Sequence, residues 1–170
     1  MMTGMTVPLL FDQQLIRQHR QRASRDYADF AFLKDAAAAR LADRLELIRR
    51  DFDLCLDLGA HDGRLAQHFA QHFAQDSAQD SAQDSAQDSV ADSAGSGTIG
   101  HMIQADPAVG FVLAAAGHGS GIVHALDQLP DKTDSFDAIF SCLSLHWVDD
   151  LRGLMMQARR LLKPDGLLLV

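Results

Sequence analysis

The chain has 170 residues, of which 47% are hydrophobic and 22% are charged, and its formal net charge is -8 at pH 7. This length and composition are typical of one soluble globular domain with a buried core. The acidic balance argues against nucleic acid as a partner, because the phosphate backbone selects basic surfaces. No apolar run is long enough to predict a transmembrane segment, and residues 1–10 lack the basic start and long apolar core of a secretory signal.

The cysteines and histidines show no metal-binding pattern. Cys55 and Cys142 each lie inside an apolar run, and the eight histidines are scattered along the chain. Metal sites place such ligands at short, recurring spacings. We therefore expect two buried free thiols and no metal ion.

Residues 1–52 are expected to form helical segments that pack against a sheet. The stretch from Phe11 to Arg25 is polar and basic, which favours a solvated helical face; the alternative is a lid over a ligand, with Tyr27 as a contact. Apolar residues then recur at steps of three and four between residues 30 and 50, which predicts an amphipathic helix. Its predicted buried stripe consists of Phe30, Leu33, Ala37, Leu41, Leu45 and Ile48.

A glycine-containing turn organises the rest of the chain. Residues 53–57 predict a first strand, which runs into Asp57-Leu58-Gly59-Ala60-His61-Asp62-Gly63, and a helix is predicted to begin near Arg64. Glycine permits a sharp turn and the close approach of a ligand. The helix N-terminus then offers free N–H groups to an anionic part of that ligand. The pattern predicts a ligand site at the end of the strand, and a strand–turn–helix without a ligand is the alternative.

A tandem repeat of Ala-Gln-Asp-Ser occupies residues 74–89 and decays through residue 97. The repeat has only alanine to bury on a helical face, so it cannot offset its ordering entropy. We interpret residues 74–97 as a low-complexity insertion that extends the helix at 64–73 and then frays. The α/β domain is thus expected to cover residues 53–170.

The next strand is predicted at residues 99–105 and ends at Asp106-Pro107. In nucleotide-binding α/β folds, an acid at this position accepts hydrogen bonds from ribose hydroxyls. Asp106 also precedes a predicted helix at 107–116, where an N-cap with proline at N1 is a compatible role.

Further strands are predicted at residues 122–124, 135–143 and 167–170. The continuous apolar character of the strand at 135–143 indicates burial on both faces and hence a parallel sheet. Asp149 or Asp150 is expected to cap the helix that follows, and Lys163-Pro164-Asp165-Gly166 predicts a turn. Strands alternating with helices predict a doubly wound, mostly parallel Rossmann-like α/β sheet.

The motifs together resemble a known family. They are Asp57-Leu58-Gly59, Asp106, Ser135-Phe136-Asp137 and Leu162-Lys163-Pro164-Asp165-Gly166. The combination looks like a class I S-adenosylmethionine (SAM)-dependent methyltransferase domain of the type 11 kind. The strongest resemblance is to the mitochondrial complex I assembly-factor methyltransferase-like family, carried by residues 11–59 and 144–151. A more distant likeness is to the malonyl-carrier-protein methyltransferase of biotin synthesis.

The resemblance implies that SAM is the cofactor and that it lies across the carboxyl ends of the first, second and fourth strands. Gly59 and Gly63 would approach its methionine part, and Asp106 would hold its ribose. The implied cofactor-binding residues are Asp57, Gly59, Ala60, Gly63, Asp106, Pro107, Asp127 and Ser141. His146 and Trp147 would face the transferred group as catalytic residues. An ordinary packed histidine and a core aromatic residue are the alternatives for these two positions.

The chain departs from the family pattern in three places. His61 replaces the central glycine of the loop, and Ala125 stands where relatives often carry an acid for the adenine amino group, leaving Asp127 as a substitute. The family's sheet has seven strands, whereas this chain ends inside the fifth, so we expect a truncated domain.

The first functional hypothesis is a SAM-dependent methyltransferase whose acceptor is a small molecule or a protein. The resemblance implies a complex I subunit as the protein acceptor, and it implies the cytoplasm of a bacterium or, in a eukaryote, the mitochondrial matrix. The alternatives are an arginine hydroxylase acting on a complex I subunit and a non-catalytic assembly module or inactive fragment. A nicotinamide-binding domain is the weakest option, because Asp57 and the spacing of Gly59 and Gly63 do not fit G-x-G-x-x-G.

Overall fold

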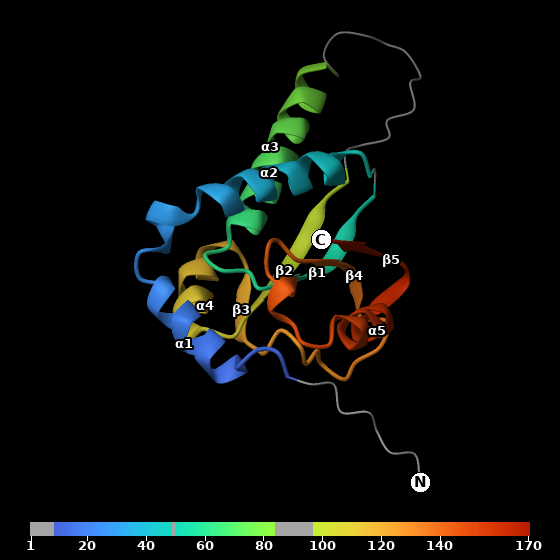
Figure 1. Cartoon of the computed structure of the whole chain (residues 1–170). Helices are drawn as coiled ribbons and strands as arrows, with labels where there is room; N and C mark the ends of the chain where they lie inside the picture. The colour runs from blue at the N-terminus through green and yellow to red at the C-terminus, as the bar shows by residue number, and fades with distance from the viewer. Residues whose placement is uncertain (1–8, 49, 84–96) are drawn as a thin grey trace.

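Five parallel strands in the order β3-β2-β1-β4-β5 form the sheet at the centre of the chain (Figure 1). The structure is a computed structural model that describes residues 9–48, 50–83 and 97–170. The strands are β1 (Phe52–Leu58), β2 (Ile99–Asp106), β3 (Ser120–Val123), β4 (Phe136–Phe140) and β5 (Leu162–Leu169). The strand order reverses between β1 and β4, which is the point where ligands bind in open α/β sheets. The predicted doubly wound parallel sheet is confirmed.

Helices cover both faces of the sheet. They are α1 (Gln13–Ala23), α2 (Phe32–Glu46), α3 (Arg64–Gln83), α4 (Val109–Ala115) and α5 (Leu151–Leu161). Short 3-10 turns lie at Tyr27–Phe30, Ala116–His118 and Leu145–Trp147. None of the helices in the described ranges combines the length and the apolar character that crossing a membrane requires.

Two hydrophobic clusters, one on each face, hold the helices to the sheet. On one face, α2 and α3 pack around Cys55, Phe69 and Phe140. The ring centroids of Phe69 and Phe140 lie 4.8 Å apart. On the other face, α5 packs through Leu154 and other buried residues against alternate residues of β1. Because side chains alternate along a strand, β1 contributes residues to both clusters and is buried on both faces.

Helix α2 buries most of the predicted stripe, since Leu41 and Leu45 are buried and Ala37 and Ile48 pack against the same cluster. Phe30 and Leu33 are 69% and 61% exposed, so their assignment to the core is wrong. The buried face of α2 consists of Lys34, Ala38, Leu41, Ala42 and Leu45. Phe30 belongs to the 3-10 turn that precedes α2, and Lys34, seven residues before Leu41, takes the buried position that the pattern assigns to Leu33.

Helix α3 continues from Arg64 to Gln83 and so includes the start of the repeat. The expected extension of this helix into the repeat is therefore observed as far as Gln83. The rest of the insertion, including residues 84–96, lies outside the described residues.

Strand β5 begins five residues earlier than predicted. Its pairing with β4 passes from Phe136 opposite Leu162 to Ala138 opposite Leu167, an irregularity that absorbs the extra residues. Asp165 lies there at a φ of 63°, so the predicted turn is present as a bulge within the strand. Nearby, Lys163 Nζ donates to the Asp137 carboxylate at 2.9 Å. The motifs that contain Asp137 and Lys163 thus join β5 to the start of β4, away from its carboxyl end.

Acidic caps partly follow the prediction. Asp150 is the N-cap of α5 and accepts a hydrogen bond from the Gly153 N–H at 2.8 Å. Asp149 accepts instead from the backbone of Leu10 and Phe11, and so ties the N-terminal segment to this loop. The N-cap role predicted for Asp106 is wrong, because α4 begins later, at Val109.

Candidate functional site

The turn after β1 lies where the carboxyl ends of β1, β2 and β4 meet. The N–H groups of Gly59 and Ala60 donate to the Ala105 carbonyl at the end of β2, at 2.8 and 3.1 Å. Gly59, His61 and Gly63 all have positive φ values, of 73°, 54° and 80°. The chain can therefore turn sharply within a few residues before α3 begins, because left-handed positions permit such turns.

The two glycines of the turn are required by packing as well as by their backbone conformation. A Cβ on Gly59 would lie 2.2 Å from the Ser144 hydroxyl, and a Cβ on Gly63 would lie 2.8 Å from a Gln104 oxygen. Both missing side chains thus point at protein atoms. A glycine is needed at each position even without a ligand.

Asp106 is fully buried at the tip of β2 and has four hydrogen bonds. The backbone N–H groups of His61 and Ala108 donate to its carboxylate at 3.1 and 2.9 Å. The Arg20 guanidinium of α1 forms an ion pair with the same carboxylate. Arg20 is 7% exposed and its guanidinium also lies over the Phe111 ring, 5.4 Å from the centroid. Arg20 thus anchors helix α1 across the end of the sheet, where the alternative interpretation of this segment, a lid over a ligand, expects it.

Asp57 is fully buried, and neither of its carboxylate oxygens has a hydrogen-bond partner in the part of the chain that the structure describes. Burial raises its pKa from 3.8 to about 6, although the positive charge of Lys34 opposes the shift. A buried carboxylate without a hydrogen-bond partner destabilises the folded state. Such a group is therefore suited to a cationic ligand.

Lys34 is a site residue that the sequence analysis missed. Its side chain is 2% exposed, and its ammonium group donates to the Gly59 carbonyl at 2.8 Å and to the Cys142 carbonyl at 3.2 Å. Burial lowers the pKa of Lys34, and the charge of Asp57 opposes that shift. A lysine inside an alanine-rich helix normally indicates a solvated position, so only its place seven residues before Leu41, on the same face of the helix, could have signalled burial.

His61 occupies the position of the expected central glycine without obstructing the turn. Its Nδ1 lies 2.8 Å from Lys34 Nζ. The same Nδ1 lies 2.7 Å from the Gly59 carbonyl oxygen, so the tautomer of the ring decides whether Nδ1 accepts from the ammonium group or donates to this carbonyl. The ring stacks on Tyr27 at 5.1 Å and meets Phe111 edge-on at 5.0 Å. Burial lowers the pKa of His61 well below its usual value, so the ring is neutral.

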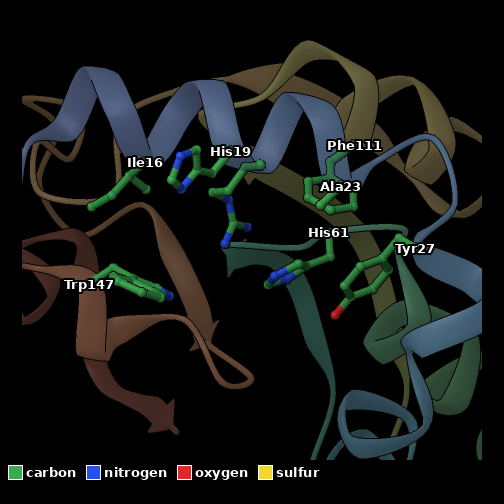
Figure 2. Close-up of a pocket in the computed structure, with 8 residues that line it drawn as sticks. Ile16, His19, Ala23, Tyr27, His61, Phe111 and Trp147 are labelled. Atoms are coloured by element: carbon green, nitrogen blue, oxygen red, sulfur yellow. The ribbon is translucent and has the colours of Figure 1, made fainter.

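A cavity of about 200 Å³ lies between α1 and this turn (Figure 2). Figure 2 shows Ile16, His19 and Ala23 along α1, with Trp147 across the cavity from His61. Its lining residues are Ile16, His19, Arg20, Ala23, Tyr27, His61, Phe111 and Trp147. The walls are mainly apolar and aromatic, with one guanidinium, which is the usual chemistry of a small-molecule site.

Trp147 and His146 lie on the 3-10 turn after β4. Trp147 is 40% exposed and meets the Phe11 ring edge-on at 5.6 Å, so its interpretation as a core aromatic residue is wrong. His146 is exposed, so its interpretation as an ordinary packed histidine is wrong as well. Of this pair, Trp147 lines the cavity beside α1.

The remaining predicted cofactor residues divide into two groups. Ala60 and Ser141 are buried at the strand ends, and the Ser141 hydroxyl donates to the Leu58 carbonyl at 2.8 Å. Pro107 lines a second cavity, of about 350 Å³, between α1 and the end of β3. Asp127 lies apart from both cavities, and its carbonyl accepts a hydrogen bond from the α5 residue Gln157.

Cys55 and Cys142 are buried free thiols, as predicted, and burial raises the pKa of both. Across the described ranges, no three histidine, cysteine or acidic side chains are grouped in a way that could hold a metal ion.

Comparison with known proteins relates this site to a family. Residues 56–170 match the family model described as a methyltransferase domain. The human protein named arginine-hydroxylase NDUFAF5, mitochondrial, is 33% identical over 162 residues, which cover 92% of this chain and 40% of the human protein. The chain therefore spans less than half the length of this relative.

A further relative and a solved structure are also similar to this chain, the latter in fold. The malonyl-[acyl-carrier protein] O-methyltransferase 1 of Coxiella burnetii is 27% identical over 158 residues, which cover 93% of this chain and 47% of the relative. The solved S-adenosylmethionine dependent methyltransferase from Mesorhizobium loti superposes with a TM-score of 0.55 at 19% identity, covering 78% of this chain and 52% of that structure. The family resemblance predicted from the sequence is confirmed.

Proposed function

Because the chain belongs to the methyltransferase domain family, we propose that it binds SAM at the carboxyl ends of β1, β2 and β4 and takes part in methyl transfer. When bound, SAM supplies an electrophilic methyl group on a sulfonium, which a nucleophile of the acceptor displaces in line. The observation that carries the proposal is Asp106, a buried carboxylate at the tip of β2 and next to the switch point of the sheet. An acid there accepts hydrogen bonds from ribose hydroxyls.

The chemistry of the turn supports this assignment. The unpartnered carboxylate of Asp57 fits a ligand with positive charges, since SAM carries a sulfonium and an ammonium group. The backbone N–H of His61 already points at Asp106, so the turn and the acid form one surface. Ala60 and Ser141, which directly follow the turn residue Gly59 and strand β4, are the neighbouring residues that we propose for cofactor binding.

Ribose binding requires Arg20 to leave Asp106, because its guanidinium donates to both carboxylate oxygens. Arg20 is the only buried residue of α1. Movement of this helix therefore exposes little other buried surface, and the helix fits the role of a lid. Tyr27 borders the same cavity and is the contact that the lid hypothesis expects.

The cavity between α1 and β3 is the place that we assign to adenine. It lies directly after Asp106, between Pro107 and the segment that follows β3, and His124 and Ala125 form one wall. Asp127, two residues beyond Ala125, is the group that we propose for the adenine amino group.

The acceptor is assigned to the aromatic cavity next to Trp147. Exclusion of water from such a cavity aids displacement at the sulfonium, because a nucleophile there loses its hydration shell. His146, which adjoins Trp147 at 5.0 Å between ring centroids, is the proposed proton acceptor. We assign residues 53–170 to the cofactor-binding domain and residues 1–52 to its helical cover.

The acceptor's identity follows from relatives only. We propose a protein acceptor, with a complex I subunit as the first to test, because the human relative named above is mitochondrial and modifies arginine by name. A bacterial cytoplasmic location is proposed if the source is bacterial. Arginine hydroxylation is the second candidate function, favoured by the same name; intact-mass analysis of a treated arginine peptide separates an added methyl group from an added oxygen atom.

Isothermal titration with S-adenosylhomocysteine (SAH), the product form of the cofactor, tests the proposal. Asp106→Asn keeps the shape of the side chain and removes its charge, so we expect SAH affinity to fall by about tenfold to a hundredfold, the scale of a hydrogen bond to a charged group. Asp53→Asn is the matched control, since Asp53 is exposed at the opposite end of β1. Absence of SAH binding by the folded chain would refute the proposal.

A further inference from the structure

The cavity next to Trp147 is built mainly from aromatic rings. Tyr27 stacks on His61 at 5.1 Å between ring centroids, and Phe111 meets both of these rings edge-on at 5.0 Å. Figure 2 shows Trp147 across the cavity from His61. Aromatic rings prefer stacked and edge-to-face neighbours of this kind. The space between Trp147 and His61 therefore favours a flat aromatic group.

The size of the cavity limits how much of an acceptor it can hold. Its volume is about 200 Å³, whereas sites for drug-sized ligands usually measure about 300 to 1,000 Å³. The cavity thus suits a single ring of the acceptor. Trp147 is exposed at its edge, so the rest of the acceptor can extend past this side chain into solvent.

The charges around the cavity are positive. Arg20 lies in its wall, with the guanidinium 5.4 Å from the centroid of the Phe111 ring, and Lys34 Nζ lies 2.8 Å from His61 Nδ1. Among the described residues that line the cavity, none carries a carboxylate. A cationic group in the cavity would therefore meet like charge, which raises its free energy of binding.

The acids close to the cavity already face cations. Asp106 forms an ion pair with Arg20, and Asp62 forms one with Arg64. Asp57 is fully buried, does not line the cavity and has a lysine charge near it. Aromatic faces also attract cations, but the guanidinium of Arg20 already takes that place. The surroundings thus favour an uncharged ring.

We propose that the methyl acceptor enters this cavity as an uncharged phenolic ring, a substrate class that rests on the proposed function. The phenol oxygen attacks the methyl carbon of SAM, and the carbon–sulfur bond breaks with both electrons going to sulfur, which gives SAH and a methyl ether. The hydroxyl proton passes to His146, the proton acceptor proposed above, and then to water. Arg20, once displaced from Asp106 by the ribose, donates to the phenol oxygen as its proton leaves. The ring belongs to a tyrosine of a protein or to a free phenol.

The test compares two ligands of equal size and different charge. p-Cresol is an uncharged phenol, whereas benzylamine carries an ammonium group at neutral pH. Both are titrated into the full chain, and binding is followed through the fluorescence of Trp147, the single tryptophan of the sequence. We expect p-cresol to bind about tenfold or more tightly than benzylamine. Equal or tighter binding of benzylamine would overturn the inference, as would a fluorescence signal that p-cresol leaves unchanged.

Two variants locate the effect in the cavity. Trp147→Leu should weaken p-cresol binding about tenfold in calorimetric titration, and the control Phe32→Leu, at an exposed residue of α2, should leave it unchanged. Arg20→Met should reduce the preference for p-cresol over benzylamine to less than about threefold, because it removes the repelling charge. Unchanged p-cresol affinity in Trp147→Leu, or a full preference in Arg20→Met, would overturn the inference.

Incubation with SAM distinguishes the two sources of the ring. p-Cresol and N-acetyltyrosine amide are supplied as acceptors, and mass spectrometry detects the methyl group added to oxygen. A methylated tyrosine amide indicates a protein acceptor, whereas methylation of p-cresol alone indicates a free phenol. No methyl ether from either compound, with a chain that binds SAH, would overturn the inference. Absence of SAH binding by the folded chain would refute the proposed function itself, which is a different result.

Discussion

Removal of the Arg20 guanidinium is expected to tighten cofactor binding, because Arg20 occupies the carboxylate assigned to the ribose. In the structure, the guanidinium donates to both oxygens of Asp106. Arg20→Met keeps an apolar stem at this position and removes the guanidinium, which lies over the Phe111 ring. The variant therefore separates the ion pair from the packing of α1.

The magnitude follows from the burial of the pair. The side chains of Arg20 and Asp106 are 8% and 0% exposed, so the pair is almost fully desolvated. Removing one partner of such a pair costs about 3 to 5 kcal/mol of stability. We take about 3 kcal/mol, because the backbone N–H groups of His61 and Ala108 still bind Asp106.

The same interaction no longer competes with the ribose hydroxyls in the variant. About 3 kcal/mol corresponds to roughly a hundredfold in affinity, and this is the upper bound. The displaced guanidinium recovers hydration in the wild type, so we expect a gain of about tenfold. Arg20→Met should thus unfold at a lower urea concentration and yet bind SAH more tightly.

The assay is calorimetric titration of SAH into wild type, Arg20→Met and Arg22→Met. Arg22 lies on the same helix and is exposed, so its substitution should change neither stability nor affinity measurably. SAH affinity that is unchanged or lower in Arg20→Met would show that Arg20 does not compete with the ligand. The lid function proposed for α1 would then be wrong.

Three further predictions concern stability. The pKa of Asp57 is raised from 3.8 to about 6, so the free energy of unfolding of the wild type falls as the pH rises through this window. Urea unfolding at a pH below the window and at a pH above it should show that Asp57→Asn gains about 3 kcal/mol relative to wild type between the two pH values. Gly59→Ala should lower the free energy of unfolding by more than about 2 kcal/mol, because its φ is 73° and its Cβ would lie 2.2 Å from a side-chain oxygen. Gly117→Ala, where a Cβ meets nothing within 4 Å, should change the free energy of unfolding little. Equal effects of the two substitutions would contradict the packing argument. Phe69→Ala should cost about 3 to 5 kcal/mol in chemical denaturation, whereas Phe32→Ala, at a residue 79% exposed, should cost less than about 0.5 kcal/mol.

The central sheet could be predicted because its signals are local. The strand ending at Asp57 and the strand around Ile139 are continuous apolar runs that end at turn residues, and burial on both faces demands such runs. Asp106 could be placed at a strand tip by the same argument. The backbone pattern thus indicated the carboxyl ends where the candidate site lies.

The charged residues of the site could not be predicted in the same way. Arg20 meets Asp106 across 86 positions of the chain, and Lys34 meets Cys142 across 108. Burial of a charge depends on partners that only the tertiary structure brings together, whereas composition alone favours a solvated face. The exposed Leu33 shows the same limit, since the neighbouring Lys34 takes the buried position on α2.

The turn itself shows how one position can satisfy two demands. His61 has a positive φ of 54°, a conformation in which histidine is among the more frequent residues after glycine. Its side chain lies against Tyr27 and Lys34 and away from the path of the backbone. The motif tolerates the loss of its central glycine because the neighbouring side chains hold the ring there.

The crystal structure of the chain with SAH tests the central claim most directly. We expect the ribose hydroxyls to donate to Asp106, Arg20 to have left this carboxylate, and α1 to have shifted with it. SAH found elsewhere, with the Arg20–Asp106 ion pair intact, would contradict the assignment of the cofactor site.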